Sequence, residues 1–152
     1  MKHFILFLSL LSFTALGQAD FEKNLQKRLI LAEDGSTIEI EAGRFQLTKS
    51  LSLEGKKNIT LRGKGIDKTI LSFKGQTQGA EGIKVSNCEN IVIEDITTED
   101  SKGDLIKTMH VKDIIFRRIK AEWTGGPKSR NGSYALYPVL CTNILIDSCV
   151  AI

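Results

Sequence analysis

Three segments of this chain align with one another without a gap. They are "IKVSNCENIVIEDI" from Ile83, "IKTMHVKDIIFRRI" from Ile106 and "LYPVLCTNILIDSC" from Leu136, and "LSLEGKKNITLRGKG" from Leu51 shares their phase. Successive copies begin 32, 23 and 30 residues apart. A repeat of that length cannot close a hydrophobic core by itself, so the copies must stack on one another as a solenoid.

Apolar and polar residues alternate inside each copy, which is the period of a half-buried strand. Ile91 and Ile93 fall on one face, Val92 and Glu94 fall on the other, and a two-residue corner follows. No copy contains a run of helical period that is long enough for a helical solenoid. Three short strands and three corners per copy predict one coil of a single-stranded parallel β-helix, an all-β fold with three sheets.

Two columns of polar residues support this register. An outward column before the two-residue corners has alternating charge and consists of Glu41, Arg62, Glu94, Arg117 and Asp147. Neighbouring parallel strands lie about 4.8 Å apart, so opposite charges in a column attract one another. A second column consists of Asn58, Asn90, Asp113 and Asn143. Asn and Asp suit tight corners because they tolerate unusual backbone dihedrals.

The three cysteines fall on core columns of the same register. Cys88 and Cys141 share one column, with Val111 between them, and Cys149 lies in the column of Ile119. Residues two coils apart are separated by roughly 9–10 Å, which is too far for a disulfide. We therefore predict three small core residues without a disulfide or metal role.

The start of the chain differs from the repeats. "MKHFILFLSLLSFTALGQAD" has a basic beginning, an apolar run and small residues at 17 and 19, which predicts a secretory signal peptide over residues 1–19. The apolar run is short for a bilayer span. We therefore expect a secreted or periplasmic protein with no transmembrane segment after cleavage. Cleavage lowers the formal net charge from +3 to +2, which does not suggest a nucleic-acid partner.

The segments next to the coils suggest how the solenoid begins and ends. Residues 20–31 place Phe21, Leu25 and Leu29 on one helical face, which predicts a helix that caps the first coil. Residues 32–152 are then the parallel β-helix coils. Because the sequence ends inside a coil at "SCVAI", we expect C-terminal coils to be missing.

Several of these segments are similar to known proteins. "DGSTIEIEAGRFQL", "NITLRGKG" and "NCENIVIEDI" resemble the opening of right-handed parallel β-helix proteins of the pectate-lyase-like superfamily. "GPKSRNGSYALYPVLCTNILIDSC" is similar to a family of exported bacterial parallel β-helix repeat proteins of uncertain activity. The resemblance implies a right-handed solenoid. It also implies that a polysaccharide would lie across the first sheet and the loops that enter it, at 74–82, 99–105 and 122–133.

The outward column of that first sheet and its loops carry the candidate site. The column is Ser52, Lys84, Lys107 and Tyr137, and the loops add Asp104, Trp123, Lys128, Arg130 and Asn131. A uronate polymer, as the ligand, would use cations for its carboxylates, an aromatic ring for a sugar face and polar donors for its hydroxyls. We predict four residues that bind such a substrate: Lys84, Trp123, Asn131 and Tyr137.

The predicted reaction is that of a uronate-polymer lyase or epimerase. Such an enzyme needs a base for the proton beside the carboxylate and a cation for the enolate-like charge that follows. Lys107 or Lys128 is a candidate base if its pKa is depressed, Arg130 is a candidate for neutralising the substrate, and Asp104 completes the predicted catalytic set. Calcium is a possible cofactor, but no grouped Asp set supports it, so we predict no metal or cofactor.

The alternative is a non-catalytic β-helix that binds a glycan or a cell-envelope partner. An enzyme requires Lys107 and Asp104 to converge with Lys128 or Arg130, whereas a binding module leaves these groups apart or paired. An apolar outward column consists of Thr60, Val92, Ile115 and Leu145. We expect a partner or the missing coils to cover this stripe.

Overall fold

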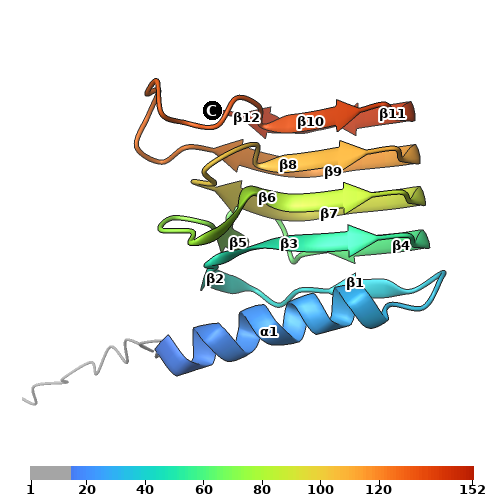
Figure 1. The fold of residues 1–152 in the computed structure, drawn as a ribbon, viewed down its shortest axis with the longest axis horizontal. Helices are drawn as coiled ribbons and strands as arrows, with labels where there is room; N and C mark the ends of the chain where they lie inside the picture. The colour runs from blue at the N-terminus through green and yellow to red at the C-terminus, as the bar shows by residue number, and fades with distance from the viewer. Residues whose placement is uncertain (1–14) are drawn as a thin grey trace, which may run out of the picture.

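A computed structural model describes residues 15–152 as one helix followed by a stack of parallel strands (Figure 1). The elements are α1 (Ala15–Leu31), β1 (Thr37–Glu39), β2 (Gly43–Gln46), β3 (Lys49–Glu54), β4 (Lys57–Arg62), β5 (Thr69–Ser72), β6 (Gln78–Ser86), β7 (Glu89–Glu99), β8 (Ile106–Met109), β9 (Lys112–Glu122), β10 (Leu136–Val139), β11 (Thr142–Asp147) and β12 (Val150–Ala151). The predicted parallel β-helix with an N-terminal helix is confirmed.

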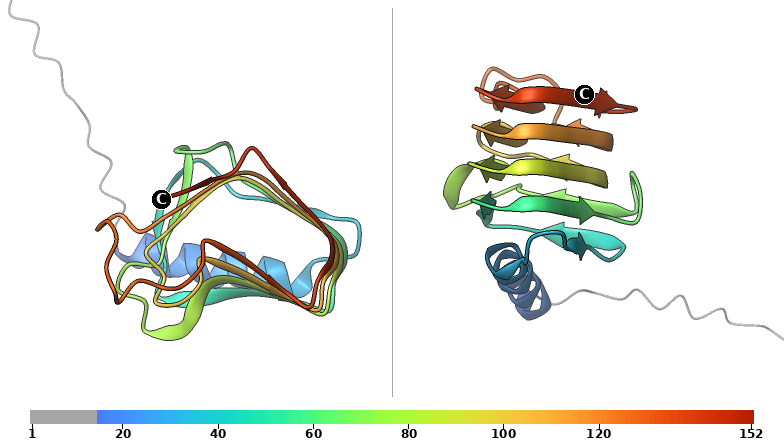
Figure 2. Two further views of the ribbon diagram at one scale, coloured as in Figure 1. Left: turned by 90° about the horizontal axis from the view of Figure 1, so that it is seen from above. Right: turned by 90° about the vertical axis from the view of Figure 1, so that its right-hand side faces the viewer.

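All strand pairs within the described residues are parallel, and each joins one coil to the next. We call the four-stranded sheet of β3, β6, β8 and β10 sheet 1. The other eight strands form a sheet that bends at the two-residue corners, through which β7 and β9 run. The part before these corners is sheet 2 and the part after them is sheet 3. Viewed along the stack, the coils follow nearly the same path on these sides (Figure 2).

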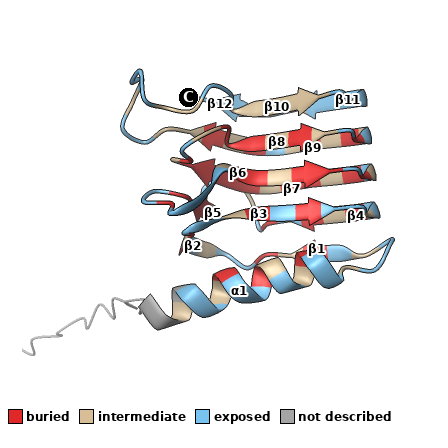
Figure 3. Ribbon diagram, in the orientation of Figure 1, coloured by how far each residue is buried: buried red, intermediate tan, exposed pale blue. Residues whose placement is uncertain are grey.

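The observed register is the one predicted for the four aligned segments. The aligned apolar residues pair in sheet 1 as Leu51, Ile83, Ile106 and Leu136, and in sheet 2 as Ile59, Ile91, Ile114 and Ile144. The inward-facing side chains of the middle coils are buried inside the solenoid, whereas the last coil is largely exposed (Figure 3). The apolar alternation therefore identifies the core correctly.

The predicted corner column adopts the left-handed backbone that Asn and Asp tolerate best. Its four residues have φ angles between 54° and 58°. The side chains also bond between coils, because Asn90 Nδ2 donates to Asn58 Oδ1 at 2.8 Å and Asn143 Nδ2 donates to Asp113 Oδ1 at 2.7 Å. These contacts tie the coils together along one edge of the solenoid.

The alternating charge column is present, but its first residue was predicted wrongly. Glu39, not Glu41, pairs with Arg62, at 3.3 Å. Arg62 also binds Glu94 at 2.6 Å, and Arg117 continues the column to Glu94 at 3.4 Å and to Asp147 at 3.2 Å. Alternation cannot separate Glu39 from Glu41, since a shift of two residues leaves the same faces inward and outward.

These ion pairs make the stability of the fold depend on pH. A hydrogen bond from Lys64 lowers the pKa of Glu39, and hydrogen bonds from Arg118 lower the pKa of Asp95. A carboxylate with a lower pKa in the folded state stabilises the fold above its unfolded pKa, and this stabilisation is lost as the pH falls through the folded pKa. We therefore expect the melting temperature to stay level near neutral pH and to fall below about pH 4.

Thermal melts at several pH values check this expectation, with Asp95→Asn as the comparison. The variant lacks one titrating carboxylate, so its melting temperature should begin lower at neutral pH and fall less steeply in acid. Identical acid profiles for the two proteins would contradict the role assigned to Asp95.

The helix α1 covers the first coil, as predicted. Leu25 and Leu29 are buried against the coil, and the Phe21 ring stacks on Phe45 with centroids 3.6 Å apart. The helix begins at Ala15, before the predicted start at residue 20. Most of the predicted signal peptide, residues 1–14, lies outside the described residues. Within the described part of the chain, no helix is long and apolar enough to cross a membrane.

Candidate functional site

The segments that lead into sheet 1 differ in part from the predicted loops. β6 begins at Gln78, so much of the predicted loop 74–82 belongs to sheet 1, where Gln78 pairs with Lys49. β7 and β9 extend to Glu99 and Glu122. The connections that remain are 73–77, 100–105 and 123–135.

Lys107 occupies the centre of the outward face of sheet 1. Lys84 is its register partner on β6, and Tyr137 is its partner on β10. The Lys107 side chain is only 26% exposed, with Nζ 3.5 Å from Glu81 Oε1 and 5.6 Å from the centroid of the Tyr137 ring. A carboxylate and the face of an aromatic ring both attract an ammonium group. Lys107 is therefore held in place between Glu81 and Tyr137.

Lys84 differs from Lys107 in its partners. It lies between Ser52 and Lys107 on the same outward column and is half-buried. Within residues 15–152, it makes no ion pair or side-chain hydrogen bond. Among the described residues, this face thus carries two neighbouring lysines and one carboxylate that pairs with them, that of Glu81. Such an excess of positive charge favours an anionic ligand.

Tyr134 and Tyr137 form an aromatic pair at the upper end of this column. Their rings are stacked with centroids 4.3 Å apart and an angle of 19° between planes, and Tyr134 is 50% exposed. Neither Tyr134 nor Glu81 was predicted as a site residue from the sequence. The spacing of the two tyrosines in "SYALYP" was a signal for the first. Glu81 lies in the irregular part of β6, between Gln78, which pairs with Lys49, and Ile83, which pairs with Leu51. The repeats do not reveal this irregularity.

Asp104 lies in the turn before β8 and is buried. Its carboxylate accepts a hydrogen bond from the backbone N–H of Tyr134 at 3.2 Å, and its backbone carbonyl accepts one from Gly82 at 2.9 Å. The first bond holds the segment that leads into β10, and the second ties the turn before β8 to β6. In this structure Asp104 acts on the site by positioning Tyr134.

Three further candidates line a hollow of about 480 Å³ beside the last coil: Trp123, Lys128 and Asn131. The indole Nε1 of Trp123 donates to the Ser101 carbonyl at 3.2 Å, and Asn131 Nδ2 donates to the Gly126 carbonyl at 2.9 Å. The second bond closes the 123–135 loop on itself. Arg130 is exposed on the same loop.

The candidates therefore fall into two groups. Lys84, Lys107 and Tyr137 lie together on sheet 1, and Trp123, Lys128 and Asn131 lie around the hollow. Among the described residues, no hydrogen bond or ion pair joins any two members of the predicted catalytic set. Their catalytic roles stay predictions.

The described residues contain no cluster of three or more His, Cys, Asp or Glu side chains that is arranged to hold a metal ion. The three cysteines in this part of the chain are free thiols. Burial raises the pKa of the Cys88 thiol. A thiol of this kind is a weak nucleophile at neutral pH, since the thiolate is the reactive form.

The fold and this site define a class of protein, a parallel β-solenoid with a cationic and aromatic face on one sheet. No protein-family model matches the sequence, and no curated protein matches it significantly. One similar solved structure is that of a protein from Parabacteroides merdae, which is provisionally described as a glycosyl hydrolase. It is 14% identical, with a TM-score of 0.47, and the alignment covers 88% of this chain and 87% of that chain. Similarity at this identity and TM-score gives no information about the site.

Proposed function

We propose that sheet 1 binds an acidic polysaccharide, a polymer of uronic acids. The observation that carries this proposal is the position of Lys107 between Glu81 and the Tyr137 ring, beside Lys84, which has no ion-pair partner among residues 15–152. Neighbouring lysines attract carboxylates. The exposed ring surface of Tyr134 offers an apolar and polarisable face to a sugar ring.

The coil repeat also suggests the direction of the bound polymer. Lys84 and Lys107 lie on adjacent strands, about 4.8 Å apart along the stack. A polymer that runs along the solenoid axis would therefore meet Lys84, Lys107 and Tyr137 in turn. Its carboxylates would bind the lysines, and one of its rings would lie near the two tyrosines.

Binding without catalysis is the role that the geometry favours. A lyase or epimerase needs its base and its charge-neutralising group at the same C–H bond, whereas Lys107 pairs with Glu81 and Asp104 with the Tyr134 backbone. Membership of the pectate-lyase-like superfamily and a uronate lyase activity stay predictions. An exported location, predicted from residues 1–19, suits a ligand in the cell envelope or outside the cell.

Titration of the purified full chain with polygalacturonate tests the proposal, with a neutral glucan as the comparison ligand. We expect Lys107→Gln to weaken binding about tenfold, which corresponds to roughly 1.4 kcal/mol. Binding should also weaken as the ionic strength rises, because salt screens exposed charges. The matched control is Lys112→Gln, at an exposed lysine on β9 that is not part of sheet 1.

Equal binding of the glucan and the polyuronate would contradict the proposal, as would equal losses in the two lysine variants. Ultraviolet absorbance of the same mixtures reports unsaturated sugar products. Their formation by the native protein, and not by Lys107→Gln, would replace the binding role with the predicted lyase activity.

A further inference from the structure

A groove lies between α1 and β3. The helix α1 covers the first coil, at one end of the solenoid (Figure 1). Its volume is about 700 Å³, which lies within the range of small-molecule sites. Its lining includes Ile30 and Leu31 from the last turn of α1, and Lys23, Lys27 and Lys49. None of these residues belongs to the outward column of sheet 1 discussed above.

The wall formed by α1 is apolar and open to solvent. Ile30 is 59% exposed and Leu31 is 63% exposed. Lys23, Lys27 and Ile30 recur at spacings of four and three residues, so they lie along one face of the helix. The alkyl parts of Lys23 and Lys27 extend the apolar wall, since lysine keeps only its charged end in water.

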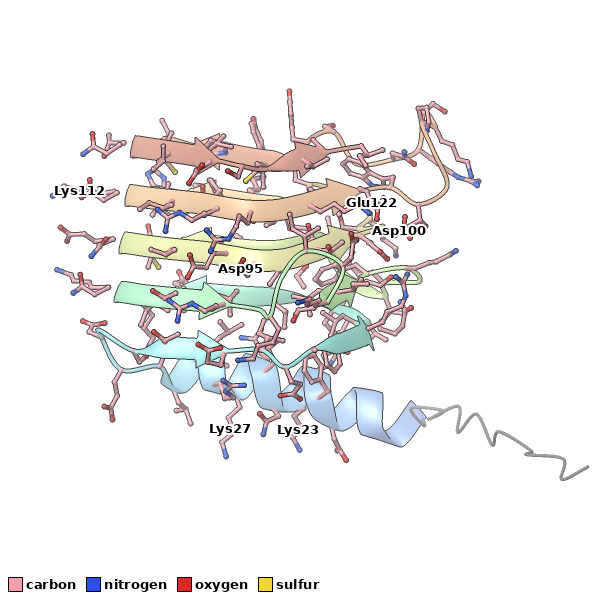
Figure 4. The ribbon with its side chains drawn as sticks, turned by 180° about the vertical axis from the view of Figure 1, so that it is seen from behind. Lys23, Lys27, Asp95, Asp100, Lys112 and Glu122 are labelled. Atoms are coloured by element: carbon pink, nitrogen blue, oxygen red, sulfur yellow. The ribbon has the colours of Figure 1, made fainter. Side chains whose placement is uncertain are left out.

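The charge around the groove is positive. Lys23, Lys27 and Lys49 are exposed, and Figure 4 shows Lys23 and Lys27 projecting from α1 away from the coils. Among the described residues of the lining, the carboxylate is that of Glu22, which is buried and accepts hydrogen bonds from the backbone N–H and Oγ1 of Thr48, both at 3.0 Å. Glu22 is thus occupied by Thr48, and the ammonium groups remain available to an anion.

The backbone edge of β3 inside the groove is partly closed by side chains of α1. Gln26 donates to the Ser52 carbonyl at 3.0 Å and accepts from the Ser52 N–H at 2.8 Å, while Glu22 binds the N–H of Thr48. A peptide that adds as a strand would need these same backbone groups. The groove therefore suits a ligand that needs apolar contact and one anionic group, but no backbone pairing.

We propose that this groove binds a single anionic amphiphile, with its alkyl chain against Ile30 and Leu31 and its head group beside the lysines. A fatty acid has this chemistry. The positive charge of the lysines favours a negatively charged head group. The exposed side chains of Ile30 and Leu31 offer an apolar surface to the alkyl chain.

Calorimetric titration with monomeric decanoate, below the concentration at which it forms micelles, tests this proposal on the full chain. Ile30→Asn combined with Leu31→Asn should weaken binding at least about tenfold. Lys23→Gln combined with Lys49→Gln should weaken binding of decanoate but not of decanol, which lacks the charge. The matched controls are Leu145→Asn and Lys112→Gln, which alter an exposed leucine on β11 and an exposed lysine on β9, in the last two coils of the stack, whereas α1 covers the first coil (Figure 1).

Melting temperatures and circular dichroism confirm that each variant is folded before its binding is compared. Three results would overturn the proposal. They are no binding of decanoate, equal binding by the Ile30 and Leu31 variant and the native chain, and binding to phosphatidylglycerol vesicles without binding of the monomeric probe. The last result would identify a membrane surface as the partner.

Discussion

Replacing Phe116 with alanine is expected to lower the free energy of unfolding by about 3–5 kcal/mol. Phe116 lies in β9, has no exposed surface and pairs in register with Ile93 and Ile146. The substitution removes a large apolar side chain and leaves a cavity. The coils above and below are tied by their own strand hydrogen bonds, so they cannot collapse into the space. Chemical denaturation measures the loss.

The matched control is the neighbouring residue Ile115. It lies in the outward column of sheet 2 and is half-buried. Ile115→Ala should cost only about 1 kcal/mol, because its side chain is already in partial contact with water. Equal losses in Ile115→Ala and Phe116→Ala would contradict the assignment of inward and outward faces.

Gly63→Ala is expected to cost about 3 kcal/mol, at the upper end of the usual effect of overpacking. A Cβ atom at Gly63 would stand 2.2 Å from the carbonyl oxygen of Asp95 and 2.6 Å from Cγ2 of Ile96. That carbonyl accepts a hydrogen bond from Gly65, and the Gly63 N–H itself donates to Glu94. Two coils must therefore separate at this corner to admit one methyl group.

Gly125→Ala is the control for this substitution. The nearest atom to a Cβ at Gly125 is Nζ of Lys128 at 2.8 Å, which is the end of a flexible side chain. We expect a change of less than about 0.5 kcal/mol in the free energy of unfolding. A large loss in Gly125→Ala, or none in Gly63→Ala, would contradict the close approach of coils at Gly63.

The repeat made most of the fold predictable from sequence. Ile83, Ile106 and Leu136 hold the same place in three ungapped copies, and one strand period is enough to decide which side chains face inward. The first coil was harder, because Glu39 and Glu41 share a face and a shift of two residues does not disturb the alternation.

The candidate site was predictable only where it follows the repeat. Lys84, Lys107 and Tyr137 are in register, so their common face follows from the alignment. Glu81 lies in an irregular part of a strand, and Tyr134 lies in a loop that enters a strand. Such segments do not follow the repeat, so the alignment of the copies cannot predict their path. The hydrogen bond between Asp104 and the Tyr134 backbone likewise depends on how two turns meet.

Hydrogen exchange in the presence and absence of a uronate oligomer tests the central claim most directly, because it reports where the ligand binds. We predict slower exchange over 78–86, 106–109 and 134–139, which carry Lys84, Lys107 and the two tyrosines. Exchange over 142–147, in sheet 2, should stay unchanged. Protection confined to sheet 2 or to α1, or no protection at a saturating concentration of the oligomer, would contradict the assignment of the binding face to sheet 1.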